Sequence, residues 1–152
     1  MSPLQETDLR VFVDSVRRYF ETSSRIVPEI TSAFLGTSEV PQHEFNGIVG
    51  LSGRFNGQVT VSMPQRPLCE LLLLQHETNL SESNLLDAVG EIANTLAGNA
   101  RQHLGNDLEI SVPITRRGRV HSLRRTRRLP YVITLRWNTY PGVVCVDVER
   151  KG

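Results

Sequence analysis

The stretch Leu85–Arg101 reads LLDAVGEIANTLAGNAR and carries two helical patterns at once. Apolar residues recur three or four positions apart, which is the spacing of one face of an α-helix. This apolar set is Leu85, Val89, Ile92, Leu96 and Ala100. A second set follows the same spacing on the opposite face: Asp87, Glu91, Asn94, Gly98 and Arg101. We therefore expect one long amphipathic helix, packed on a core through its apolar set.

Two glycines, Gly90 and Gly98, lie inside this predicted helix. A glycine in a helix interior costs about 1 kcal/mol relative to alanine, and a face that only meets water does not need that cost. Small residues beside a carboxylate and a carboxamide suit a surface that another backbone or side chain approaches closely. We expect this second face to dock a partner, and an ordinary solvated surface is the simpler alternative.

The composition is that of an ordinary globular domain. The chain has 152 residues, 39% of them hydrophobic and 22% charged, so it can bury a core without metals or disulfides, and we expect one domain over residues 1–152. Its apolar runs are too short to span a membrane, and the first twenty residues are amphipathic and charged, so we expect a cytoplasmic protein without a leader. Cys69 and Cys145 are expected to be free thiols.

Helical spacing before the long helix predicts a first helix over residues 6–20, with Thr7 available as its cap. Residues 26–30 are a possible short strand. A hairpin is expected to turn at Asn56-Gly57, and a short helix is expected over residues 68–75. Gly47, Gly50 and Gly53 are spaced by three within a predicted strand, which indicates tight sheet packing and not a dinucleotide fingerprint.

After the long helix, alternating apolar residues predict a strand over 108–114 and a terminal hairpin over 131–148 that turns at Tyr140-Pro141-Gly142. The whole pattern indicates an α+β fold, an antiparallel-rich sheet with two long helices packed on one face. The four histidines are scattered singly, without the spacing of metal ligands, and no Walker loop is present, so no metal site is predicted.

The pair Glu91 and Asn94 closely resembles the Glu-x-x-Asn motif of the CheC/CheX/FliY phosphatases, which dephosphorylate the chemotaxis response regulator CheY. The likeness includes Asp87 and Gly98 in the pattern Asp-x-x-x-Glu-x-x-Asn-x-x-x-Gly, the continuation to Arg101, and the strand Ile110-Ser111-Val112-Pro113. It covers roughly residues 45 to 115 well. A single copy of the motif in a chain of this length is similar to the CheX branch.

The resemblance implies a CheC-like fold and a homodimer. It also implies that Glu91 forms an ion pair with the regulator's active-site lysine, while Asn94 orients the attacking water, and that no cofactor is bound by this chain because Mg²⁺ belongs to the regulator. Asp87, Gly98 and Arg101 are candidate partner contacts, with Gly98 providing clearance. The alternative is a non-catalytic module that sequesters a receiver domain through the same helix face.

A basic run departs from the family pattern. Residues 110–136 hold eight arginines and no acidic residue. Seven of the eight form the run Arg116, Arg117, Arg119, Arg124, Arg125, Arg127 and Arg128. We expect a solvated loop here. Binding to nucleic acid or to an acidic protein surface is the weaker alternative. The run lacks interleaved aromatic residues and the sequence pI is only about 7.9, which argues against a dedicated nucleic-acid domain.

Overall fold

The computed structural model describes residues 2–36, 40–120 and 129–151. Three helices lie in these ranges: α1 (Glu6–Ser24), α2 (Gln65–Leu74) and α3 (Glu82–Leu104). The long strands are β2 (Glu29–Leu35), β3 (Phe45–Ser52), β4 (Phe55–Met63), β7 (Tyr131–Trp137) and β8 (Tyr140–Arg150). Three short strands complete the set: β1 (Ser2–Pro3), β5 (Glu109–Ile110) and β6 (Ile114–Arg117).

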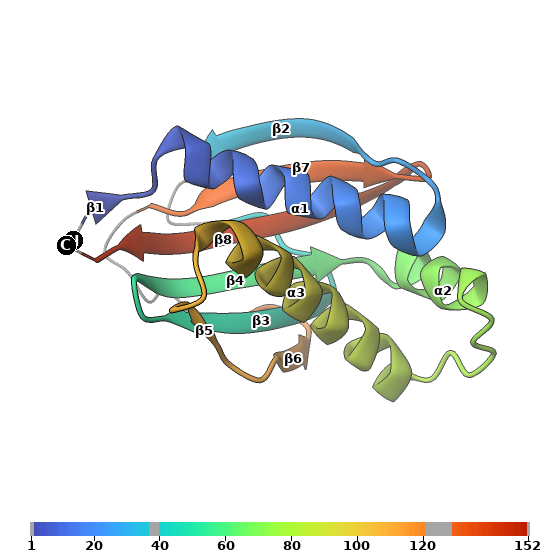
Figure 1. Cartoon of the computed structure of the whole chain (residues 1–152). Helices are drawn as coiled ribbons and strands as arrows, with labels where there is room; N and C mark the ends of the chain where they lie inside the picture. Colours follow the sequence, from blue (N-terminus) through green and yellow to red (C-terminus); the bar gives the residue numbers. More distant parts are fainter. Residues whose placement is uncertain (1, 37–39, 121–128, 152) are drawn as a thin grey trace.

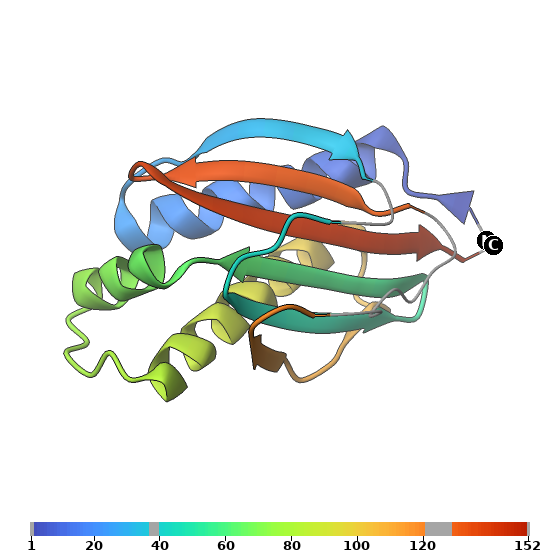
Figure 2. The same ribbon diagram turned by 180° about the vertical axis from the view of Figure 1, so that it is seen from behind.

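The strands form one antiparallel sheet in the order β2-β7-β8-β4-β3-β5, with β1 paired to β8 and β6 paired to β3. Figure 1 shows α1 and α3 side by side in front of this sheet, and Figure 2 shows its other face. The predicted α+β class, with two long helices on one face of an antiparallel sheet, is confirmed. Because α3 lies over β3 and β4, its far side is turned away from the sheet.

The core fills the space between the helices and the sheet. The apolar set predicted for α3 is buried there, from Leu85 to Ala100. At the far end of α1, the indole Nε1 of Trp137 donates to Ser24 Oγ at 2.9 Å, and the rings of Phe20 and Trp137 lie 5.9 Å apart. Buried Asp8 accepts two hydrogen bonds from the Arg150 guanidinium, so both ends of α1 are fixed to the sheet.

Both predicted hairpin turns were misplaced by a few residues. The first turn lies at Gly53-Arg54, because β4 already begins at Phe55 and Gly57 pairs within the sheet. A Cβ on Gly57 would lie 2.0 Å from the Asp147 carbonyl oxygen, so this glycine permits a close approach of two strands. The second turn lies at Asn138 and Thr139, which both have positive φ as hairpin turns of this length require.

The remaining boundaries were predicted with mixed success. Helix α1 is capped by Gln5 and not by Thr7, and the Asp8 carboxylate accepts from the Gln5 backbone N–H. The strand expected over 26–30 occurs as β2, shifted toward its C-terminal side, and α2 begins at Gln65, three residues before its predicted start. Cys69 and Cys145 are not joined to each other in a disulfide.

The strand expected over residues 108–114 is interrupted. Its two parts, β5 and β6, both pair with β3, and Ser111 bridges them through hydrogen bonds to Gly50. Pro113 lies in the gap, where it has no N–H to donate. Across the described ranges, none of the helices is long and apolar enough to cross a membrane.

Candidate functional site

Helix α3 begins at a regular cap and lies close to the sheet. The Ser81 hydroxyl oxygen accepts from the Asn84 backbone N–H at 3.3 Å, which satisfies one of the free N–H groups of the first turn. The helix then approaches β3 at Gly47, where a Cβ would lie 2.5 Å from the Val89 carbonyl oxygen and 3.0 Å from Gly90 Cα. This contact between two backbones fixes the height of α3 above the sheet.

Gly90 has a structural role within the chain. It is buried, and a Cβ at this position would lie 2.7 Å from Thr115 Cγ2 of β6 and 3.5 Å from Pro113 Cβ. The prediction that the helix glycines serve a docking face is therefore wrong for Gly90. A side chain there would push β6 away from α3.

The predicted polar set does share one side of α3. At roughly 100° per residue its five members fall within an arc of roughly 80°. We call them the outward ridge: Asp87, Glu91, Asn94, Gly98 and Arg101. Gly98 is half-buried and the other four are exposed. Because the buried residues of α3 lie on its opposite side, the ridge faces away from the sheet.

Glu91 and Asn94 lie at the middle of this ridge. They are three residues apart, so their Cα atoms are separated by about 4.5 Å along the helix axis and their side chains share one face. Neither the Glu91 carboxylate nor the Asn94 carboxamide forms a side-chain hydrogen bond or an ion pair with another described residue. An acid and an amide are thus presented together to the solvent.

The Glu91 carboxylate also influences a neighbouring tyrosine of α1. Burial raises the pKa of the Tyr19 phenol, and the negative charge of Glu91 raises it further, while side-chain hydrogen bonds with Ser23 and Gln75 act in the opposite direction. Gln75 caps the C-terminus of α2. Glu91 therefore lies near the place where α1, α2 and α3 meet.

Gly98 differs from Gly90 because a side chain added there would point into open space. A Cβ at Gly98 would meet no atom within 4 Å, so the described fold gives no reason for a glycine here. Arg101, one turn further on, donates to the Asn106 carbonyl oxygen at 3.1 Å and so closes the C-terminal end of the helix. Asp87 is exposed one turn before Glu91.

The sequence analysis did not predict the ion pairs of Arg117 with Glu44 and Glu82 near the start of α3. Arg117 was assigned to a solvated basic loop, but it ends β6, and its Nε donates to Glu44 at 2.6 Å. The same guanidinium lies 3.4 Å from the Glu82 carboxylate, in the first turn of α3, and over the Phe45 ring. Arg117 therefore links β6 to α3. The basic residues 121–128 lie outside the described residues.

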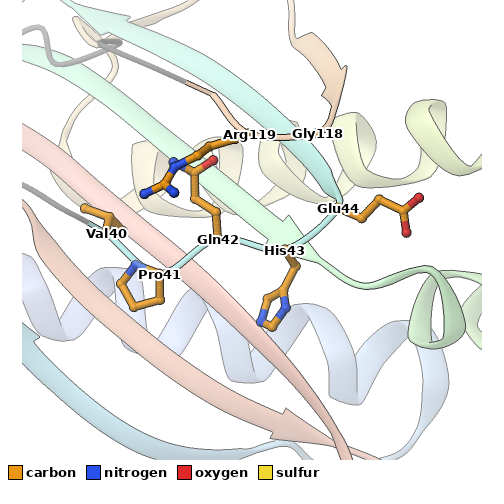
Figure 3. A pocket seen from close by; sticks show the side chains of 7 residues that line it. All are labelled: Val40, Pro41, Gln42, His43, Glu44, Gly118 and Arg119. Carbon is orange, nitrogen blue, oxygen red and sulfur yellow. The ribbon is translucent and has the colours of Figure 1, made fainter.

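A cavity on another part of the molecule is not a candidate active site. It has a volume of about 590 Å³ and lies on the face of the sheet opposite α3, under the segment that leads into β3. Figure 3 shows the side chains of His43, Glu44 and Arg119 pointing away from one another, so they do not converge on a ligand. Within the described ranges, no cluster of three His, Cys, Asp or Glu side chains could hold a metal ion.

Solved structures share this fold. Chemotaxis protein CheX from Vibrio vulnificus is 18% identical with a TM-score of 0.80, covering 94% of this chain and 99% of that one. A CheC-like superfamily protein from Shewanella sp. PV-4 is 17% identical with a TM-score of 0.83, covering 96% and 99%. The CheX–CheY–BeF3–Mg²⁺ complex from Borrelia burgdorferi is 16% identical with a TM-score of 0.74, covering 93% and 97%.

A family model supplies the evidence that these low identities cannot. A search of the curated proteins gives no match. The family model described as chemotaxis phosphatase CheX, however, matches residues 45–136, which is more than half of the chain and includes all of α3. This protein belongs to the chemotaxis phosphatase CheX family.

Proposed function

We propose that this protein hydrolyses the aspartyl phosphate of a CheY-like receiver domain, using the outward ridge of α3. The observation that carries the proposal is the exposed pair Glu91 and Asn94, held together on a rigid helix and not engaged by the described remainder of the chain. Membership of the CheX family supports it. The Borrelia burgdorferi structure, in which a CheX is bound to CheY with BeF3 and Mg²⁺, supports the choice of partner.

Asn94 has the chemistry that this reaction needs. An aspartyl phosphate is an acyl phosphate, and phosphoryl transfer passes through a loose transition state in which positioning matters more than a strong base. The Asn94 carboxamide has both an acceptor oxygen and donor N–H groups, so it can hold a water molecule in line with phosphorus. A mobile side chain would lose this advantage, and α3 provides a fixed support for the amide.

Glu91 provides the docking contact. Its carboxylate would form an ion pair with the active-site lysine of the receiver, which sets the register between the two proteins. Because Asn94 is less than one helical turn away, the same register brings the carboxamide to the phosphoryl group. Docking and water positioning thus depend on one segment of one helix.

The other ridge residues would act at the edges of this contact. Gly98 leaves room for the receiver to approach the helix backbone, and Asp87 and Arg101 extend the surface on either side. The chain binds no cofactor in this scheme, because Mg²⁺ is held by the receiver. The family resemblance further leads us to propose a cytoplasmic homodimer.

The test is the decay of radiolabelled phosphate on a cognate receiver in the presence of Mg²⁺. The wild-type protein should accelerate the decay, and Asn94→Ala should reduce kcat about 10²-fold or more while the receiver still binds, because only water positioning is lost. Glu91→Ala should act mainly on KM. His103→Ala is the matched control, since His103 is exposed on α3 but lies outside the ridge.

Two outcomes would contradict the proposal in different ways. Unchanged decay with every receiver of the source organism would rule out the phosphatase activity. If the wild-type protein binds a phosphorylated receiver without hydrolysis, and Glu91→Ala abolishes that binding while Asn94→Ala does not, the protein is a sequestering module that uses the same face.

A further inference from the structure

The two borders of the outward ridge face different neighbours. At roughly 100° per residue, Gly90 lies just beyond the border formed by Asn94 and Arg101, on the side where a Cβ would meet β6. Burial raises the pKa of Tyr19 on α1 and the charge of Glu91 raises it further, so Glu91, at the opposite border, faces α1. Figure 1 shows α1 beside α3 on the same face of the sheet. The surface next to Glu91 is therefore supplied by α1.

Arg18 lies on the side of α1 that is turned toward α3 and the solvent. It directly precedes Tyr19, so it lies about 100° from that residue around the helix axis, away from the core. Leu9 and Val13 mark the other side of α1, because they line a groove against β2 and β7. Figure 1 shows α1 between β2 and α3. Arg18 is thus on the same outer surface of the molecule as Glu91.

Arg18 differs from the other arginines of α1 and α3 in its contacts. Arg10 and Arg17 lie 3.4 Å and 3.8 Å from carboxylates of their own helix, and Arg101 donates to the Asn106 carbonyl oxygen. The exposed guanidinium of Arg18 forms no hydrogen bond or ion pair with another described residue. Its positive charge is not compensated within the described part of the fold.

The ridge alone is too small to hold a partner specifically. A stable interface covers about 800 Å² on each protein, or roughly 20 to 30 residues, and the ridge consists of five. A receiver seated on the ridge must therefore extend over at least one flank. On the β6 flank, Arg117 is already engaged by Glu44 and Glu82. The α1 flank carries the uncompensated charge of Arg18.

The chemistry of a receiver supplies the opposite charge. Proteins hold Mg²⁺ through carboxylates together with phosphate oxygens, so a site that contains Mg²⁺ and an aspartyl phosphate is surrounded by acidic side chains. Resting on the proposed function, we propose that Arg18 is a second docking residue, which forms an ion pair with an acidic side chain at the rim of the receiver's phosphorylation site. Glu91 meets a cation of the receiver and Arg18 meets an anion. Two contacts of opposite sign fix the orientation of the receiver on the ridge, which a single contact cannot do.

The test measures binding and hydrolysis separately. Binding uses the cognate receiver with BeF3 and Mg²⁺, the components of the Borrelia burgdorferi complex, and hydrolysis uses the decay of radiolabelled phosphate. Arg18→Glu should raise Kd and KM about tenfold or more with kcat unchanged, because a repulsive charge at the rim of an interface acts on association. Arg18→Lys keeps the charge and should bind more tightly than Arg18→Ala. Added salt should weaken the wild type more than Arg18→Ala.

Arg17→Glu is the matched control, since it makes the same change of charge at the neighbouring position. Arg17 is exposed but lines the groove on the β2 side of α1, so this variant should bind the receiver like the wild type. A panel of receiver variants, each with one rim acid changed to lysine, identifies the partner of Arg18. One of them should recover binding to Arg18→Glu, which a folding defect cannot imitate.

The outcomes separate this inference from the proposed function. Wild-type affinity in Arg18→Glu, an equal loss in Arg17→Glu, or no recovery with any receiver variant would overturn the role of Arg18 and leave the phosphatase activity as measured. If the wild type binds the receiver without hydrolysing its phosphate, and Arg18→Glu weakens that binding, the docking role holds and the proposed hydrolysis fails. A wild type that binds no receiver overturns both.

Discussion

The inward and outward sides of α3 each contain one glycine, Gly90 and Gly98, and the two differ in what a side chain would meet there. Gly90 is in contact with its own fold, since a Cβ there would meet Thr115 at 2.7 Å. A Cβ at Gly98 would meet no atom of the described residues within 4 Å. An unfavourable residue in a helix therefore indicates a constraint without saying whether that constraint lies inside the chain or in a partner.

Neighbouring residues on the two faces should separate stability from activity. Ile92 is fully buried, so Ile92→Ala should lower the free energy of unfolding by about 2–5 kcal/mol through a cavity in the core. Asn94 is exposed, so Asn94→Ala should change it by no more than about 0.5 kcal/mol. Urea denaturation measures both. A large loss of stability in Asn94→Ala would mean that the Asn94 side chain contributes to folding, and the two faces of α3 would then not differ in this respect.

The close approach of α3 to β3 should tolerate no added side chain. Gly47→Ala places a methyl group 2.5 Å from the Val89 carbonyl oxygen and 3.0 Å from Gly90 Cα. Because both of these atoms belong to the helix backbone, α3 must move outward. Overpacking of this kind costs about 1–3 kcal/mol. Thermal unfolding measures the loss, and amide exchange of α3 should report the shifted helix. Wild-type stability in this variant would show that the helix height is not fixed at Gly47.

The two helix glycines should respond oppositely to alanine. Gly98→Ala removes the helix penalty without a clash and should stabilise the protein by up to about 1 kcal/mol, while weakening its affinity for a phosphorylated receiver. Gly90→Ala gains the same helix propensity but must displace Thr115, so its gain should be smaller or reversed. Equal stabilisation of both variants, with receiver binding intact in Gly98→Ala, would refute the distinction.

The smallest effect is electrostatic and reports the position of Glu91. The pKa of Tyr19 is raised above its ordinary value of 10.0 by burial and by the Glu91 charge, so Glu91→Gln should lower it toward that value. Ultraviolet difference absorbance during a pH titration follows the phenol. Because the unfolded phenol ionises first, the wild type should lose stability as the pH rises above 10.0. An unchanged titration in Glu91→Gln would place the carboxylate further from α1.

Much of this architecture could be predicted from local patterns. The apolar repeat of α3 required a helix whose Leu85-to-Ala100 face is buried, and alternation identified β7 and most of β8. The turns were less predictable. Asn56-Gly57 is a strong turn signal, but Gly57 is used for a close contact with β8, and no local pattern distinguishes these two uses of glycine. The role of Arg117 was equally hidden, since Glu44 and Glu82 are distant from it in sequence.

Local periodicity and residue type specify the helix of Leu85–Arg101, the side of it that carries Glu91 and Asn94, and the alternating strands, because both act over a few neighbouring positions. The packing of distant segments settled that a side chain at Gly90 would clash while one at Gly98 would not, and that Arg117 joins β6 to α3. Each of these depends on which distant segments meet. That outcome is set by the packing of the whole chain and not by the spacing of residues along it.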